Sequence, residues 1–176
     1  MNSEHALDIA LLVLRVGLGL SLFAHGAQKL FGWFGGHGLA GTGGFFDSIG
    51  FRPGKTNALL AGLGEAGGGL LLALGLFTPI GGAAVVGTMI VAASVHQNAG
   101  FFAQGGGYEL PLFYGIAGAV LTISGPGQFS IDDALDYPLA DTWIGVTALI
   151  VAAVASLGLI VRQRAWLKAN AQPVDA

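Results

Sequence analysis

Five long stretches of the chain are almost wholly apolar. They cover residues 9–30, 57–77, 79–98, 110–124 and 143–161. About 20 apolar residues cross the roughly 30 Å of hydrocarbon in a bilayer, and in lipid only helices or closed barrels satisfy their own backbone hydrogen bonds. The stretches do not alternate between apolar and polar residues, as the strands of a membrane barrel do. The pattern therefore predicts an all-α protein, a polytopic membrane helix bundle with five spans.

The composition supports this prediction and excludes several classes of function. Hydrophobic residues make up 53% of the chain and charged residues 10%, the formal net charge is −3, and there is no cysteine. Without cysteine the chain forms no disulfide and ligates no iron–sulfur cluster or haem through a thiolate. A net acidic chain is not typical of nucleic-acid binding. The lipid bilayer is therefore the expected partner, and nucleic acid is not.

The first apolar stretch is expected to remain in the protein as a span. A secretory signal peptide begins with a basic region, whereas the titratable side chains of residues 1–8 are Glu4, His5 and Asp8. Arg15 also interrupts the run where a signal peptide is uniformly apolar.

The distribution of Lys and Arg predicts the orientation of the spans. Five spans place segments 31–56 and 99–109 and the C-terminus on one side of the membrane, and the N-terminus and segment 125–142 on the other. The first side holds the basic residues Arg52, Lys55, Arg162, Arg164 and Lys168, and the second side holds only acidic ones. Because basic residues in short loops stay in the cytoplasm, we expect an outside N-terminus and a cytoplasmic C-terminus. The alternative, four spans with 143–161 on the membrane surface, would place the C-terminal basic residues beside the acidic segment.

The segment at 31–56 is too aromatic for an ordinary loop. Thr42 is expected to cap a short helix that carries Phe45, Phe46 and Ile49 and ends at Gly50. Aromatic side chains at headgroup depth are common anchors, which favours an interfacial helix. The alternative is a lid over an internal site.

Segment 125–142 predicts a turn followed by a short helix that Ser130 caps. Its acidic residues Asp132, Asp133 and Asp136 would lie in or near the first turn, where the helix dipole favours them. A solvated acidic face is the favoured interpretation, and metal binding by these carboxylates is a weakly specified alternative. No metal site is therefore predicted.

Glycine and proline predict how the helices pack. Glycines crowd the first span and the sequence around Glu65, and in lipid such small residues let helix backbones approach closely. The corner at Phe77-Thr78-Pro79 leaves almost no room between the second and third spans. These two spans should form a hairpin of adjacent antiparallel helices, with Pro79 at a helix start.

Buried charges are the strongest functional signal in the sequence. Charge within hydrocarbon costs a few kcal/mol and is normally paired or faces water, and Arg15 and Glu65 both lie well inside spans. Their estimated depths differ by about 8 Å at 1.5 Å per residue, so we expect the two side chains to pair. A polar pocket reaching from the inner face to mid-membrane would then be lined by Arg15, His25, Lys29, Glu65, His96 and Glu109, together with Gln28 and Gln97.

Three interpretations of this pocket stay open. An Arg15–Glu65 pair can simply fix the register of two helices. Alternatively, ionisable groups inside a membrane mark a substrate, quinone or proton site. Ligation of a haem or a chlorophyll-like pigment by His25 or His96 is the third interpretation, although a single histidine without a paired motif is weak evidence.

Several motifs, in order, resemble the DoxX family of small bacterial membrane proteins. They are Leu14-Arg15-Val16-Gly17, His25-Gly26-Ala27-Gln28-Lys29, Gly41-Thr42-Gly43-Gly44-Phe45-Phe46, Glu65 among glycines, and Phe77-Thr78-Pro79. The resemblance covers about residues 7–125. It implies a four-helix core over residues 1–125, with residues 126–176 adding an acidic loop, a fifth transmembrane helix and a basic tail.

The same resemblance implies a function and a location. The family is related to the DoxD subunit of thiosulfate:quinone oxidoreductase, which suggests a multi-pass protein of the bacterial inner membrane that is a subunit of a redox or quinone-linked complex. Arg15, His25, Lys29 and Glu65 match the family's polar positions. Any enzyme activity would then be that of a non-autonomous oxidoreductase subunit with other membrane-protein subunits as partners.

No cofactor is expected within the chain, although the pocket could bind a quinone.

Two further functions remain as alternatives. The chain would otherwise be an accessory subunit that stabilises a larger respiratory or photosynthetic assembly without its own catalysis. A solute carrier is disfavoured, because five spans divide poorly into inverted repeats.

Overall fold

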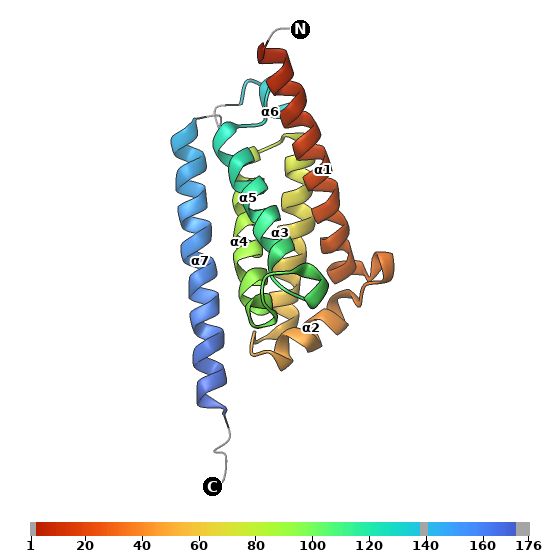
Figure 1. The fold of residues 1–176 in the computed structure, drawn as a ribbon, viewed down its shortest axis with the longest axis vertical. Coiled ribbons are helices and arrows are strands. Elements are labelled where there is room, and N and C mark those ends of the chain that lie inside the picture. The colour runs from red at the N-terminus through yellow and green to blue at the C-terminus, as the bar shows by residue number, and fades with distance from the viewer. Residues whose placement is uncertain (1–2, 138–140, 172–176) are drawn as a thin grey trace.

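The computed structural model describes residues 3–137 and 141–171, which form a helical bundle without strands (Figure 1). Its α-helices are α1 Ser3–Phe31, α2 Gly38–Ser48, α3 Gly54–Leu74, α4 Thr78–His96, α5 Glu109–Ser124, α6 Ile131–Ala134 and α7 Thr142–Ala169. In the described part of the chain, three single 3₁₀ turns lie in the connections. Five of these helices, α1, α3, α4, α5 and α7, run along the long axis of the molecule (Figure 1). The predicted all-α fold is confirmed.

Among the described residues, four helices are long and apolar enough to cross a membrane by length and composition. They are His5–Phe31, Gly54–Leu74, Thr78–Ala99 and Thr142–Ala169. The remaining predicted span, 110–124, is α5, an apolar helix of 16 residues. At 1.5 Å per residue it is about 24 Å long, shorter than a full hydrocarbon core. It lies against α4 within the same bundle.

Close backbone approach joins α1 to α3, the most extensive helix pair in the bundle. A methyl group built on Gly26 would overlap the backbone of Ala66, and one on Gly19 would overlap the backbone of Gly69. Apolar side chains gain little by leaving lipid, so contact between small residues supplies the dispersion energy that holds such helices together. The glycine-rich packing predicted for these two spans is therefore present.

Adding a methyl group at Gly26 is expected to destabilise the bundle. Gly26→Ala should lower the unfolding free energy by about 1–3 kcal/mol, the usual cost of overpacking, because the obstructing atoms belong to backbone. Gly17 on the same helix is the control, since a methyl there meets nothing within 4 Å. Thermal unfolding followed by tryptophan fluorescence measures both. Equal stability of the two variants would contradict the proposed close contact.

The hairpin between α3 and α4 also follows the prediction. Gly75 adopts a left-handed conformation (φ 62°) and ends α3, and Pro79 lies in the first turn of α4. Phe77 between them has φ 46°, a conformation that is uncommon for a side chain of this size. It is held there by Asp132, whose carboxylate accepts hydrogen bonds from the amides of Phe77 (2.8 Å) and Thr78 (2.9 Å).

Asp132 corrects the interpretation of the acidic segment. Its side chain is 6% exposed and also accepts a hydrogen bond from the Thr78 hydroxyl (2.8 Å). A solvated face is therefore wrong for this residue, although Asp133 and Asp136 are exposed. The capping prediction is confirmed, since the Ser130 hydroxyl accepts from the Asp133 amide (3.1 Å) at the start of α6. Asp132 thus fastens the segment before α7 to the first turn of α4.

The aromatic segment forms α2, which lies across one end of the bundle (Figure 1). This helix begins at Gly38, with His37 before it, so the prediction that Thr42 caps it is wrong. Thr42 is instead buried within the helix. The helix ends at Ser48, and Gly50 (φ 89°), where it was predicted to end, lies in the turn that follows. α2 packs on α3 and α1 and covers the C-terminal end of α1 and the N-terminal end of α3 (Figure 1).

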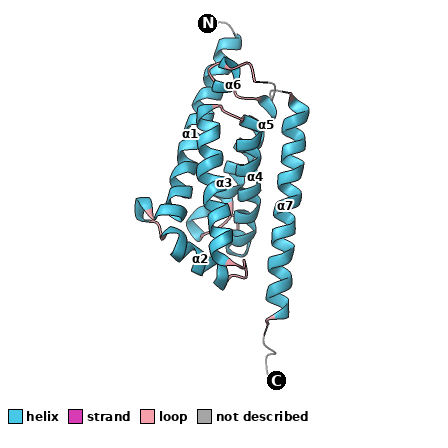
Figure 2. Ribbon diagram, turned by 180° about the vertical axis from the view of Figure 1, so that it is seen from behind, coloured by secondary structure: helices cyan, strands magenta, loops and turns pink. Residues whose placement is uncertain are grey.

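α7 packs on α4 and, less extensively, on α5. Thr122 of α5 contacts both α4 and α7, because methyl groups built on Gly82 of α4 and Gly145 of α7 would overlap it. α7 continues to Ala169, eight residues beyond the predicted span. Arg162, Arg164 and Lys168 therefore lie on this helix and not in a tail. Near its C-terminal end, α7 reaches the α2–α3 connection, where Gln163 donates to the carbonyl of Ile49 (2.7 Å; Figure 2).

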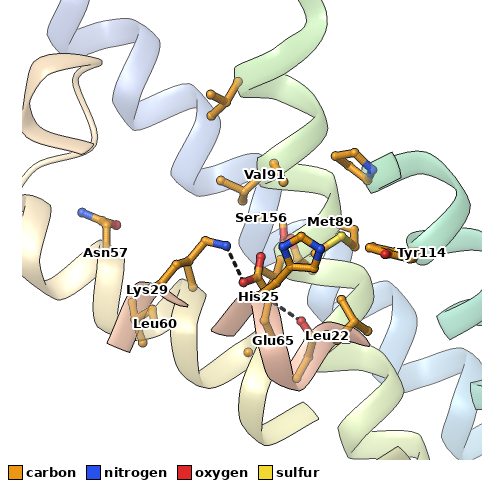
Figure 3. Close-up of a pocket in the computed structure, with 18 of the residues that line it drawn as sticks. Leu22, His25, Lys29, Asn57, Leu60, Glu65, Met89, Val91, Tyr114 and Ser156 are labelled. Atoms are coloured by element: carbon orange, nitrogen blue, oxygen red, sulfur yellow. Dashed lines mark hydrogen bonds and ion pairs between the residues drawn. The ribbon is translucent and has the colours of Figure 1, made fainter. Parts of the chain in front are cut away.

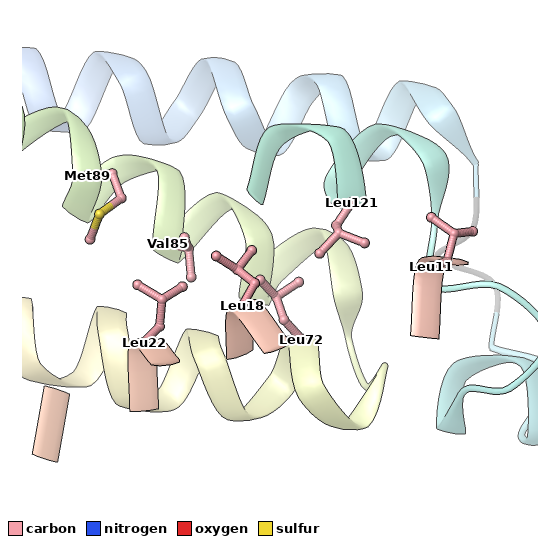
Figure 4. Close-up of a cluster of buried hydrophobic side chains, with 7 residues drawn as sticks. All are labelled: Leu11, Leu18, Leu22, Leu72, Val85, Met89 and Leu121. Atoms are coloured by element: carbon pink, nitrogen blue, oxygen red, sulfur yellow. The ribbon is translucent and has the colours of Figure 1, made fainter. Parts of the chain in front are cut away.

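The apolar core lies between α1, α3, α4 and α5. Its buried members are Leu11, Leu18, Leu22, Leu72, Val85, Met89 and Leu121 (Figure 4). Leu22, Leu72, Val85 and Leu121 are fully buried. Met89 stands at the end of this cluster nearer α2 and also lines the cavity described below. The core therefore separates the cavity from the end of the bundle that Asp132 closes.

Candidate functional site

A cavity of about 1040 Å³ occupies the half of the bundle nearer α2. Residues from α1, α2, α3, α4, α5 and α7 line it, and most of them are apolar or small. Its ionisable and hydroxyl groups include His25, Lys29, Glu65, His96 and Tyr114. Figure 3 shows several of these side chains converging around Glu65. The site thus combines an apolar enclosure with a small group of proton donors and acceptors.

The ion pair between Lys29 and Glu65 is the most buried charged feature of the cavity. The Lys29 Nζ atom lies 2.5 Å from Glu65 Oε2, and the side chains are 26% and 4% exposed. Because each Cα–Cβ bond tilts toward the N-terminus of its helix, Lys29 leans back along α1 while Glu65 leans along α3 toward α2. In antiparallel helices these two directions converge. The close approach at Gly26 and Ala66 keeps the two backbones near enough for the pair to form.

His25 and Tyr114 form a second polar contact beside this pair. His25 lies one turn before Lys29 on α1, and its ring meets that of Tyr114 from α5 edge to face, with centroids 5.9 Å apart. Figure 3 shows the imidazole beside the Glu65 carboxylate, with Met89 behind it. A carboxylate, an ammonium group, an imidazole and a phenol therefore face a common space.

The predicted pair between Arg15 and Glu65 is wrong. Arg15 is 2% exposed and donates from Nη1 to the carbonyl of Ala73 (3.3 Å) and from Nη2 to the carbonyl of Phe129. Its Nε is buried without a hydrogen-bond partner in the described part of the chain. Arg15 therefore binds the C-terminal end of α3 and the segment before α6, outside the cavity.

The direction of the side chains explains the error. The register of the two helices places Gly26 on Ala66 and Gly19 on Gly69. Arg15 consequently lies near Ala73, eight residues or about 12 Å along α3 from Glu65. Both side chains also lean toward the N-termini of their own antiparallel helices, which carries them apart. The prediction that they meet used only their estimated depths in the membrane.

The two remaining predicted pocket residues separate from each other. His96, at the end of α4, lines the cavity, and its Nδ1 lies 2.8 Å from the carbonyl of Gly106. Glu109 is not among the lining residues, and its carboxylate accepts a hydrogen bond from the Ala103 amide (2.8 Å). Of the six candidates, the structure brings His25, Lys29, Glu65 and His96 to one cavity and places Arg15 and Glu109 elsewhere.

Six polar residues that line the cavity were not predicted to do so: His37, Thr42, Asn57, Thr88, Tyr114 and Ser156. Tyr114 had a usable signal, because it is a phenol inside an otherwise apolar stretch. Ser156 had none, since serine is common in membrane helices, and here its hydroxyl donates to the carbonyls of Gly87 (2.8 Å) and Ala152 (2.7 Å). The predicted aromatic segment also reaches the cavity, through Phe45, Phe46 and Phe51.

The arrangement suits an amphipathic ligand better than a metal. Within the described ranges, no group of three or more His, Cys, Asp or Glu side chains is placed to hold a metal ion. Mostly apolar walls with a few convergent polar groups are typical of small-molecule sites. Tyr114, Lys29 and a protonated His25 offer donors, and Glu65 offers an acceptor. Such a set can bind carbonyl or hydroxyl oxygens of a ligand whose remaining surface is apolar.

A family model described as DoxX matches residues 10–98, which include α2, α3, α4 and most of α1. No curated protein and no solved structure is significantly similar to the chain.

Proposed function

We propose, from the premise that the chain belongs to the DoxX family, that it is an integral membrane subunit of a quinone-linked redox complex. The observation that carries the proposal is the cavity, in which the Lys29–Glu65 pair, His25 and Tyr114 face mainly apolar walls. A quinone has the matching chemistry, because its ring carries two carbonyl oxygens and its tail is a hydrocarbon. With no cysteine to ligate an iron–sulfur cluster, the electrons would come from a partner subunit.

Each polar group has a separate role in this proposal. Lys29 and Tyr114 would donate hydrogen bonds to the quinone oxygens, and Glu65 would hold Lys29 in place. His25, beside Glu65 and Tyr114, is positioned to supply or accept a proton as the quinone is reduced or the quinol oxidised. Phe45, Phe46 and Phe51 would cover the ring from the side of α2.

Quinone binding to the purified protein tests this proposal. We expect saturable binding of a short-chain ubiquinone or menaquinone analogue, and Glu65→Gln should weaken it at least about tenfold, the equivalent of one charge-assisted hydrogen bond. Glu109→Gln is the matched control, because that carboxylate lies outside the cavity. Negligible binding to the unaltered protein, or the same loss in both variants, would refute the proposal.

The predicted orientation belongs to the same proposal. Arg52, Lys55, Arg162, Arg164 and Lys168 gather at the α2 end of the bundle, and the acidic segment with Asp132 lies at the other end. The rule that basic residues stay in the cytoplasm would then place the half of the bundle that holds the cavity toward the cytoplasmic side of the inner membrane. Because the chain has no cysteine, single cysteines at Lys168 and Asp136 report the orientation through labelling by an impermeant reagent. Labelling of Lys168→Cys from outside intact cells would reverse it.

A second function is favoured by the exposure of α7. Of the most apolar 18-residue stretch of α7, only 17% is buried in the molecule, against 33–44% of the corresponding stretches in the other three long apolar helices. Such a face meets either lipid or another membrane protein. The alternative is therefore an accessory subunit that stabilises a larger assembly through α7 without its own catalysis. Purification in mild detergent as a lone chain without partners would count against it.

A further inference from the structure

The cavity continues as a groove between α3 and α7 on the surface of α4. Both helices pack on α4, and contacts between α3 and α7 themselves are few or absent. The groove is lined by Leu60 and Gly64 of α3, Thr88 and Val91 of α4, and Ala155 and Leu159 of α7. Leu60 is 54% exposed, and Val151 on the α7 wall is 62% exposed. The groove is therefore apolar, has a floor of small side chains and opens toward the bilayer.

The end of the groove nearer α2 is basic. Asn57 lines it, and the Arg162 guanidinium lies 3.5 Å from the Asn57 amide oxygen and 3.1 Å from the carbonyl of Arg52. Arg52 in turn stacks over the ring of Trp166, 4.6 Å from its centroid. Arg52 and Arg162 are both exposed, and the acidic partner of this pair within the described residues is Asp47, 3.9 Å from Arg52.

The helical register places Arg162 on the groove side of α7. At 100° per residue, Arg162 lies within about 20° of Ala155 and about 60° of Leu159. Arg164 and Lys168 are about 160° and 120° away from Arg162 around the helix. Seven residues separate Ala155 from Arg162, which is about 10 Å along the helix axis. An apolar track therefore leads directly to two guanidinium groups.

We propose that an anionic phospholipid occupies this groove, with an acyl chain along α4 between α3 and α7 and its phosphate at Arg52 and Arg162. A planar guanidinium donates two parallel hydrogen bonds to two oxygens of a phosphate, and basic pockets between membrane helices recognise anionic headgroups. The small residues on the groove floor leave room for the chain. The site lies on the α7 side of the bundle and does not depend on the quinone proposal.

The proposal predicts selective lipid retention. Native mass spectrometry of the purified protein, titrated with phosphatidylglycerol or phosphatidylcholine in mixed micelles, should show tighter binding of phosphatidylglycerol. Arg52→Gln/Arg162→Gln should weaken that binding about thirtyfold, as expected for two basic contacts with an anionic headgroup. Arg164→Gln/Lys168→Gln is the control, because it removes the same charge from the same end of α7 on another face.

A second variant tests the groove without touching its charges. Ala155 is exposed and lines the groove, so Ala155→Phe should fill the path of the acyl chain while leaving the fold intact. We expect it to lower phosphatidylglycerol binding, because the phenyl ring would occupy the space of the acyl chain. Equal binding of the two lipids, equal losses in both double variants, or unchanged binding after Ala155→Phe would each overturn the proposal.

Discussion

Replacing Lys29 by methionine is expected to destabilise the protein by about 3–5 kcal/mol, the cost of leaving a buried charge without its partner. The variant retains most of the volume of the side chain and removes its charge. Glu65, whose side chain is 4% exposed, then loses the ammonium group that pairs with its carboxylate. The midpoint of thermal unfolding in detergent, followed through the three tryptophans, measures this loss.

A double variant tests whether this loss of stability comes from the unpaired charge of Glu65. Lys29→Met/Glu65→Leu replaces both charges by apolar groups, and replacement of a buried ion pair in this way is often neutral or stabilising. We therefore expect the double variant to recover most of the lost stability and to lose quinone binding. Lys168→Met, at an exposed position, is the control and should change the stability by no more than about 0.5 kcal/mol. A double variant as unstable as Lys29→Met would contradict the pairing.

Substituting Asp132 should have the next largest effect. Asp132→Ala removes three hydrogen bonds to the first turn of α4 and a carboxylate that attracts the Arg15 guanidinium. Hydrogen bonds to a charged group are worth about 1.5–3 kcal/mol each and do not add fully, so we expect a loss of about 3 kcal/mol or more. Chemical unfolding of the purified variant measures this change.

The neighbouring aspartate provides a matched control for this substitution. Asp133 is exposed, and the capping bond at this position uses its amide, which alanine keeps. Asp133→Ala should therefore leave the stability within about 0.5 kcal/mol of the unaltered protein. If the two alanine variants were equally unstable, the acidic segment would be acting as a diffuse charged surface, and the specific role given to Asp132 would be wrong.

Local patterns in the sequence predicted most of the helices. Long apolar runs, the Pro79 corner and the Ser130 cap act within a few residues of where they occur, and each predicts its own element. The start of α2 was missed, because Gly38 and the residues after it carry no capping signal and only packing on α3 makes them helical. The end of α7 was placed too early, since Arg162 and Lys168 extend a helix beyond the hydrocarbon as readily as they end a span.

The site was harder to predict because it depends on how two helices slide past each other. His25 and Lys29 lie on the same face of α1 as Arg15, so sequence periodicity cannot tell which cation meets Glu65. The glycine contacts between α1 and α3 set the axial register of the two helices. The tilt of the side chains then brings Lys29 toward Glu65 and carries Arg15 away from it. Asp132 was misread for a similar reason, because its partners Phe77 and Thr78 are more than fifty residues away in the chain.

Photoaffinity labelling with an azido-quinone tests the central claim most directly. If the cavity around the Lys29–Glu65 pair binds a quinone ring, peptide mapping should find the label on α1 near His25 and on α5 near Tyr114. Excess unlabelled quinone should abolish this labelling, and Glu65→Gln should reduce it. Labelling confined to the lipid-facing surface of α7, or labelling that excess quinone does not reduce, would contradict the claim.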